Sequence, residues 1–361
     1  MKPDIKFPFY AKASLVCIGL VAFVSTLSFL QNIILPIIYA TVIAVVLSPF
    51  VNFFVKKRMS RIIAIILTLF LVIITTVSIV ILLSSQIMQF SDSFPKLVEK
   101  FQQILNQSIA LVSDNFNISP RKINLWLTSK NTEILNGSSA FIGQTLVDTG
   151  NILIVLVLIP VYVFMILFYQ PLLIEFIHKL FKSSNQQEVS EVLSATKKII
   201  RSYLVGLLLE AGIIAALNST ALLILGIDYA ILLGIIGAIL NVIPYIGGII
   251  AVALPMLIAL ATKSPSYCLL VLASYTLIQF IDNHYIIPKV VASKVKINAL
   301  ISIIVVLVGG ALWGIPGMFL SIPLTAILKV IFDHIETLKP WGFLLGDTMP
   351  NTHYLKSIEK K

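Results

Sequence analysis

Residues 237–248 read GAILNVIPYIGG and lie in the middle of an apolar run that covers about 229–261. Pro244 has no backbone N–H to donate, and a proline ring clashes with the preceding helical turn. Gly247 and Gly248 tolerate backbone angles that other residues resist. The stretch therefore predicts a helix that breaks halfway along an otherwise continuous apolar segment.

The composition indicates what surrounds this break. Of the 361 residues, 58% are hydrophobic and only 12% are charged, and the mean hydropathy is +1.01. Soluble domains carry about 25% charged residues, so lipid is the expected solvent for most of this chain. The apolar runs lie at about 13–31, 33–55, 62–84, 150–169, 202–225, 229–261, 266–287 and 298–331.

Six of these runs suit a single crossing, because a helix needs about 20 apolar residues to span a bilayer. The 229–261 and 298–331 runs differ, since each is too long for one comfortable span and too short for two. The first run, from Ala13 to Leu30, has no cleavage site of the A-x-A type and is expected to be a retained span.

The break divides its run into half-helices of about 229–242 and 248–261. Each is about 20 Å long, which is shorter than a hydrocarbon core of about 30 Å. Backbone groups that a break sets free must be buried in protein or line a wet cavity. We therefore expect a re-entrant hairpin whose tip carries Asn241, Pro244 and Tyr245.

The second long run also contains a predicted helix break, with Gly309-Gly310 followed by Gly314-Ile315-Pro316-Gly317. Paired broken segments in two halves of a chain point to a transport site near the bilayer midplane. The alternative is that these glycines only let helices pack closely, as small residues four apart do. The predicted substrate-binding residues are Asn241, Pro244, Tyr245, Gly247, Gly248, Gly309, Gly310, Gly314 and Gly317.

The charges predict the orientation. The net charge is +10, and in a membrane chain basic residues mark cytoplasmic loops rather than a nucleic-acid surface. If the N-terminus is cytoplasmic, most of the 26 Lys and Arg residues fall on the inner side, provided that both long runs return to the side from which they came. This predicts cytoplasmic N- and C-termini and two hairpins that enter from opposite faces.

The same pass along the chain predicts five parts. A helical pattern in the polar interruption suggests a small extracytoplasmic insertion that is structural or an oligomer contact, and 171–200 suits an amphipathic helix on the inner surface. The expected parts are 1–85 with three transmembrane helices, 86–149 as the extracytoplasmic helical segment, 150–201 as a transmembrane helix plus the amphipathic helix, 202–335 as the transport core, and 336–361 as the cytoplasmic tail.

Ionisable side chains inside membrane runs cost about 3 kcal/mol at the centre and usually have a function. Glu210 lies within the 202–225 run, and its expected partner is Asn218 on the same helix or a group on a hairpin. Asp282 and His284 lie near the inner end of another run. We predict that these three residues couple transport to a proton or cation. The alternative for Glu210 is that it only satisfies a helix break.

Asp282 has its own alternative, which is an interfacial ion pair with Lys289 or Lys294. No metal site or cofactor is expected, because Cys17 and Cys268 lie in apolar runs and the histidines have no metal-ligand spacing. No phosphate loop or HExxH motif is present, and Asp282 has no second aspartate in a membrane run. We therefore do not expect an enzyme.

The motifs around the breaks resemble the autoinducer-2 exporter family of bacterial membrane proteins. The resemblance rests on N-x-I-P-Y-x-G, on an acidic residue six positions before a proline, and on GG-x-x-x-G-x-x-G ending in P-L. The matching positions are Asn241, Ile243, Pro244, Tyr245 and Gly247, then Asp282 and Pro288, then Gly309, Gly310, Gly314, Gly317 and Pro323. His284 departs from the family pattern, in which many members carry a small or amide residue near the acid.

This resemblance implies a transporter in the bacterial inner membrane and a homo-oligomer. Some members are linked to export of autoinducer-2 and others to sodium–proton exchange. The combined expectation is an all-α polytopic membrane protein with about six transmembrane helices, two re-entrant hairpins and a small extracytoplasmic helical insertion. It would export a small polar solute such as autoinducer-2. The rivals are a monovalent cation/proton antiporter and a membrane scaffold that transports nothing.

Overall fold

The computed structural model describes residues 8–116, 157–181, 186–243, 247–290 and 297–347. Within these ranges every regular element is helical, which confirms the predicted all-α class. The elements are α1 (Phe9–Phe29), α2 (Gln31–Lys56), α3 (Arg61–Phe116), an unlabelled helix (Val157–Leu180), α5 (Gln186–Ile224), α6 (Ala230–Asn241), α7 (Gly247–Thr262), α8 (Pro265–Ile281), the π-helix η2 (Asp282–Ile286), α9 (Ile287–Val290), α10 (Ala299–His334), the 3₁₀-helix η4 (Glu336–Leu338) and α11 (Lys339–Leu345).

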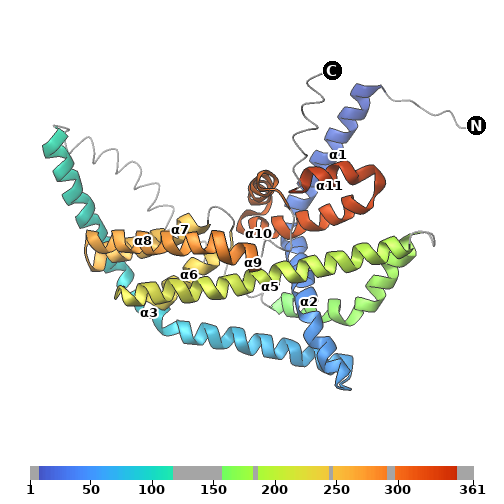
Figure 1. The fold of residues 1–361 in the computed structure, drawn as a ribbon, viewed down its shortest axis with the longest axis horizontal. Helices are drawn as coiled ribbons and strands as arrows, with labels where there is room; N and C mark the ends of the chain where they lie inside the picture. The colour runs from blue at the N-terminus through green and yellow to red at the C-terminus, as the bar shows by residue number, and fades with distance from the viewer. Residues whose placement is uncertain (1–7, 117–156, 182–185, 244–246, 291–296, 348–361) are drawn as a thin grey trace, which may run out of the picture. The chain divides into compact units, whose positions relative to one another are not determined.

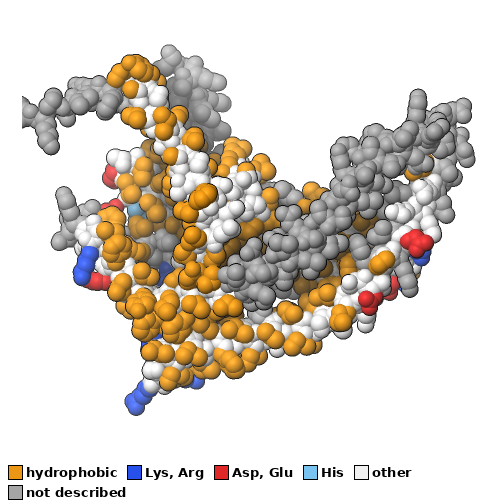
Figure 2. Space-filling model, turned by 180° about the vertical axis from the view of Figure 1, so that it is seen from behind, with side chains coloured by type: hydrophobic (Ala, Val, Ile, Leu, Met, Phe, Trp, Pro, Cys, Tyr) orange, Lys and Arg blue, Asp and Glu red, His pale blue; other side chains and the backbone are white. Residues whose placement is uncertain are grey.

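Seven of the described helical segments are long and apolar enough to cross a membrane. Their outer faces carry large apolar side chains, for example Phe23, Leu82 and Leu208, which are 63%, 75% and 67% exposed. Figure 2 shows apolar side chains spread over the described helices, with charged side chains in only a few places. Such surfaces need lipid around them, so the chain is a multi-pass membrane protein.

Six of the seven candidate spans coincide with the six single crossings that the sequence predicts. They are Phe9–Phe29, Gln31–Lys56, Arg61–Asp92, Val157–Leu180, Gln186–Ile224 and Pro265–Val290. The seventh is α10, which covers the second long run and contains a kink.

The chain forms two compact units. The first contains 1–49, 162–203 and 294–361, and the second contains 50–161 and 204–293. The boundaries fall inside α2, inside the Val157–Leu180 helix and inside α5.

In the second unit, the predicted broken helix is present as α6 and α7. Their bounds agree with the expected half-helices to within a residue or two, and the turn residues 244–246 lie outside the described part. The chain returns tightly, because a Cβ added to Gly247 would lie 2.7 Å from the carbonyl carbon of Leu240 and 2.9 Å from the Cα of Asn241. Only glycine fits at this return.

The helices α5, α6, α7 and α8 share one apolar core, and α6, α7 and α8 lie side by side (Figure 1). The α5–α6 contact is close, because a Cβ added to Gly234 would lie 2.6 Å from the backbone nitrogen of Ser219. Residues of all four helices in the core are buried, including Leu222, Leu233, Ala259 and Val271. This packing holds the end of α6 against α8.

In the first unit, α10 contains the second predicted break. Gly314 has φ 63° and ψ −146°, a conformation that residues with a side chain rarely adopt. Eight residues of straight helix cover about 12 Å. Gly309 and Gly317 are nevertheless in contact, since a Cβ added to Gly309 would lie 2.5 Å from the carbonyl oxygen of Gly317. The helix therefore folds back at Gly314, although its total length qualifies it as a span. That either hairpin enters the membrane and returns stays a prediction.

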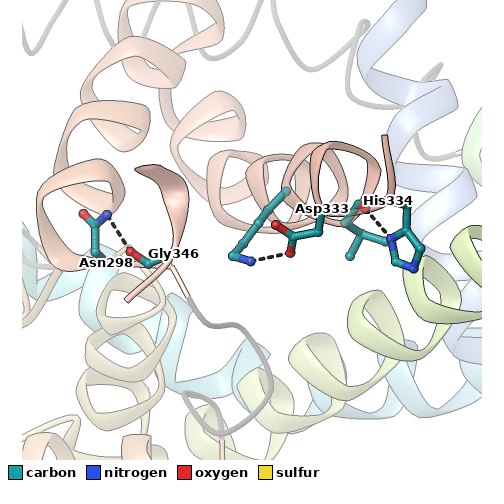
Figure 3. A network of polar contacts seen from close by, with 6 residues as sticks. Asn298, Asp333, His334 and Gly346 are labelled. Atoms are coloured by element: carbon teal, nitrogen blue, oxygen red, sulfur yellow. Dashed lines mark hydrogen bonds and ion pairs between the residues drawn. The ribbon is translucent and has the colours of Figure 1, made fainter. Parts of the chain in front are cut away.

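Asn298 joins the start of α10 to the end of α11 (Figure 3). Its side chain accepts from the Ile301 N–H at 2.9 Å and so caps the start of α10. It also donates to the carbonyl oxygens of Leu344 and Gly346, at 2.8 and 3.0 Å. One amide thus satisfies backbone groups at the start of α10 and at the end of α11, groups that a helix alone leaves unpaired.

Two boundaries differ from the sequence expectation. The third span and the helix predicted after it form a single helix, α3, which runs on to Phe116. The rest of the predicted extracytoplasmic segment, 117–149, lies outside the described residues. Similarly, 186–200 is the first part of α5 rather than a separate surface helix, because no proline interrupts α5. Buried and exposed positions in this part still recur at the helical spacing that the amphipathic pattern predicts.

Candidate functional site

Three polar side chains from three elements of the second unit meet in its interior. Glu210 lies on α5, Asn241 is the last residue of α6, and Asp282 begins η2. Glu210 is 5% exposed and Asp282 is 0% exposed. The Nδ2 of Asn241 donates to Asp282 Oδ2 at 2.8 Å and lies 3.5 Å from Glu210 Oε1. We call Glu210, Asn241 and Asp282 the carboxylate cluster.

The break between α6 and α7 places Asn241 in this cluster. Asn241 is the last residue of α6. Its side chain therefore lies at the helix end, next to the break. The return of the chain at Gly248 brings a second amide nearby. A Cβ added to Gly248 would lie 2.9 Å from Gln279 Cδ and 3.3 Å from Asn241 Oδ1. The missing side chain at Gly248 thus leaves room for Gln279.

Asp282 is held by amides, with one oxygen left over. Gln279 Nε2 donates to Asp282 Oδ2 at 3.4 Å and to Asn283 Oδ1 at 3.3 Å. Asp282 Oδ1 is buried and has no hydrogen-bond partner among the described residues. Buried polar atoms in proteins are almost always satisfied by protein, water or ligand. This oxygen is therefore the acceptor at which a proton, a cation or a solute donor can bind.

Asp282 also opens a π-helical turn. The N–H of Ile287 bonds to the carbonyl oxygen of Asp282, five residues earlier. Single π turns inside α-helices are rare and occur often at functional sites. The sequence did not predict this turn, because no residue pattern distinguishes it from ordinary α-helix.

His284 lies apart from the carboxylate cluster. Its side chain is exposed, its Nδ1 lies 2.9 Å from the carbonyl oxygen of Phe280, and its ring stacks on the Phe280 ring at 4.2 Å between centroids. The structure therefore brings together two of the three predicted coupling residues. The described partners of Asp282 are amides rather than Lys289, and Lys294 lies outside the described residues.

The contact with Asn241 decides between the two expected partners of Glu210. Glu210 contacts Asn241, which belongs to the hairpin, and does not contact Asn218, which lies further along α5. Gln279 was not predicted as a site residue. Its contact with Asp282 follows from ordinary i, i+3 helical spacing, so that spacing was the available signal.

The structure does not place the remaining predicted binding residues in the carboxylate cluster. Pro244 and Tyr245 lie outside the described residues. The four glycines of α10 belong to the first unit, where Gly309 and Gly310 pack against Gly317 and Met318 of the opposite arm, and Gly314 is exposed. These contacts agree with the close-packing alternative. A substrate contact at these glycines stays a prediction.

The charges of the cluster are unbalanced. Among the described residues, no Lys, Arg or His forms an ion pair with Glu210 or Asp282, and no group of three or more His, Cys, Asp or Glu could hold a metal ion. Two carboxylates near one amide nitrogen repel each other when both are charged. The arrangement can therefore take up a proton or a monovalent cation, and the amides can orient a hydroxyl-bearing solute.

The sequence matches a known family along most of its length. Residues 17–337 match the family described as AI-2E family transporter. The AI-2 transport protein TqsA of Escherichia coli (strain K12) is 26% identical over 344 residues, which is 91% of this chain and 93% of TqsA. YueF of Bacillus subtilis (strain 168), named provisionally as a transport protein, is 24% identical over 336 residues, which is 91% of this chain and 89% of YueF. YrrI of the same strain, named in the same way, is 34% identical over 132 residues, which is 37% of each chain.

Proposed function

We propose that this chain, which belongs to the AI-2E family of transporters, exports a small polar solute and couples its movement to a proton or cation at the carboxylate cluster. Membership makes it a membrane transporter. The finer proposal is a small hydroxyl-bearing solute such as autoinducer-2, which the name of TqsA supports. We further propose a homo-oligomer in the bacterial inner membrane with both termini in the cytoplasm, from the charge distribution and the family resemblance.

The observation that carries the proposal is the position of Asn241. It stands at the break of the α6–α7 hairpin and contacts both buried carboxylates. Any displacement of the hairpin tip changes the hydrogen bonds that these carboxylates receive. Conversely, a proton or cation bound to a carboxylate of the cluster weakens its hydrogen bond with the Asn241 amide. Asn241 can then move away from the carboxylates more easily. Binding at the cluster and movement of the hairpin are therefore linked in both directions.

The roles divide by chemistry. Glu210 and Asp282 would carry the coupling ion, because a carboxylate can change its charge between the two access states. Asn241, with the freed backbone at the tip, would contact the solute. A part for His284 in coupling stays a prediction, and its exposed position would place it at a different step from the carboxylates.

A cation/proton antiporter is the second candidate. Carboxylate and amide oxygens are hard ligands of the kind that Na⁺ and Li⁺ prefer, and the free Asp282 Oδ1 is such a ligand. A membrane scaffold is the third candidate. It predicts no flux, and it predicts that polar substitutions at 241–248 act only through packing.

One experiment separates the three candidates. The purified protein is reconstituted in liposomes and assayed against a panel of small metabolites, and separately with only Na⁺, Li⁺ and a pH gradient. Movement of a hydroxyl-bearing solute supports the exporter. Cation-driven proton flux without any organic solute supports the antiporter, and the absence of all flux supports the scaffold.

A further inference from the structure

A second pair of buried polar side chains lies in the same unit. Asn218 on α5 is 3% exposed, and Tyr275 on α8 is 7% exposed. The Asn218 Oδ1 and the Tyr275 hydroxyl are buried polar atoms without a hydrogen-bond partner among the described residues. Tyr275 lies within the apolar core of α5 to α8, where an unpaired hydroxyl is costly.

Both side chains face the same point on α6. A Cβ added to Gly237 would lie 3.2 Å from Asn218 Nδ2 and 3.4 Å from the Tyr275 hydroxyl oxygen. The nearest atom from α7 is the Cβ of Ala251, at 3.7 Å from the same point. Four helices thus converge here, and because α6 carries a glycine, the polar ends of Asn218 and Tyr275 approach its backbone together.

This pair is displaced from the carboxylate cluster in one consistent direction. Asn218 is eight residues beyond Glu210 on α5, Tyr275 is seven residues before Asp282, and Gly237 is four residues before Asn241. At 1.5 Å per residue these separations are about 12, 10 and 6 Å.

All three displacements point to the end of the unit where α5 meets α6 and α7 meets α8. The two connections lie together there, because a Cβ added to Gly226 would lie 3.6 Å from Lys263 Nζ. The buried pair is therefore on the way from the carboxylate cluster to this end.

We propose that Asn218, Tyr275 and Gly237 form a second station that binds a neutral hydroxyl group between the carboxylate cluster and this end of the unit. The inference rests on the proposed transport function and adds to it a further site with a stated chemistry. An amide and a phenol both donate and accept hydrogen bonds and carry no charge. The station therefore suits water or the hydroxyl of a solute, each of which can donate and accept at once.

Cysteine accessibility tests the station without relying on transport. Asn218→Cys is made in a background in which Cys17 and Cys268 are replaced by serine, and it is treated with a small neutral thiol reagent in liposomes. The matched control is Leu222→Cys, one turn further on α5 and 0% exposed in the apolar core. We expect modification at 218 at least about tenfold faster than at 222, because only the former faces polar partners. Equal and negligible rates at both positions would overturn the proposal even if wild-type transport is intact.

Two further arms identify the source of the hydroxyl. If the transported solute slows modification at position 218, the guest is the solute, and if only water is present at the station, the solute leaves the rate unchanged. Tyr275→Phe is then compared in flux with Tyr267→Phe, a half-buried tyrosine two turns earlier on α8.

Solute flux should fall about tenfold for Tyr275→Phe alone, the loss expected from one hydrogen bond. If the solute slows modification at position 218, full activity of Tyr275→Phe or an equal loss in both variants would contradict the station. A wild-type protein that moves no solute would contradict the proposed function instead, and the accessibility result would still decide the station.

Discussion

Asn241 Nδ2 and Asp282 Oδ2 lie 2.8 Å apart, although 41 residues separate them in the chain. The amide ends α6 at the hairpin break, and the carboxylate opens the π-helix on the neighbouring helix. Because Asp282 is completely buried, this amide supplies one of the few hydrogen bonds that its carboxylate receives. The contact therefore ties the shape of the hairpin to the charge state of the site.

Replacement of Asn241 by leucine tests this tie. Leucine has about the same volume as asparagine but no hydrogen-bond donor. The buried Asp282 carboxylate would then keep only the longer contact with the Gln279 amide. We expect a loss of about 1–3 kcal/mol in the free energy of unfolding, the cost of an unsatisfied buried polar group. Thermal unfolding in detergent measures it. Asn283→Leu is the control, because that amide is exposed, and an equal loss in the control would contradict the role of Asn241.

A double replacement should recover part of this loss. When Asp282 is also changed to leucine, the stronger of the two acceptors of the Asn241 amide is gone, and only Glu210 still loses that donor. The combined effect is therefore smaller than the sum of the two single effects. Coupling energies of about 0.5–3 kcal/mol are typical of residues in contact. A full thermodynamic cycle of Asn241→Leu and Asp282→Leu measures the coupling, and strict additivity would show that the two side chains do not interact.

Gly314 and Gly212 offer a matched pair of glycines. Neither would place an added Cβ within 4 Å of another atom, but only Gly314 has a positive φ. Gly314→Ala should destabilise the protein by about 1–3 kcal/mol through backbone strain. Gly212→Ala lies inside α5 and should stabilise it by up to about 1 kcal/mol. Unfolding midpoints that shift in the same direction for both variants would contradict the kink in α10.

Asn298→Ala should loosen the start of α10 and the end of α11 together. The variant loses the cap of α10 and the two bonds to the end of α11, at a cost of about 1–2 kcal/mol. Amide hydrogen exchange should become faster at Ile301. It should also become faster at Gly346, because the Gly346 N–H lies at the end of α11 that Asn298 holds in place. As a control, Ser302→Ala removes only a bond to the preceding helical turn and should leave Gly346 unchanged.

The local features of the fold were predictable from the sequence, and the contacts of the site were not. Pro244 with two glycines, and four glycines around Pro316, mark breaks whose cause lies within a few residues. The apolar run lengths likewise predicted six spans that the structure contains. The unbroken course of α3 was missed, because the change from apolar to polar residues suggested the end of a span, whereas α3 continues past it and even past Pro95, a residue that usually interrupts a helix.

The site itself depends on packing that no local pattern encodes. Asp282 meets Asn241 only because α6 and α8 lie against a common core, and Gln279 reaches its place because Gly248 carries no side chain. Glu210 and Asp282 were predicted individually from their cost in a membrane run. Their shared amide, the separate position of His284 and the buried pair of Asn218 and Tyr275 required the tertiary structure.

The central claim, that the carboxylate cluster carries the coupling ion, is tested most directly by flux of the Glu210→Gln variant. Wild type, Glu210→Gln and the control Asp228→Asn, an exposed acid between α5 and α6, are reconstituted in liposomes with a proton gradient. The account predicts that Glu210→Gln keeps its fold and loses gradient-driven transport, while Asp228→Asn behaves as wild type. Gradient-driven transport by Glu210→Gln at the wild-type rate would contradict it.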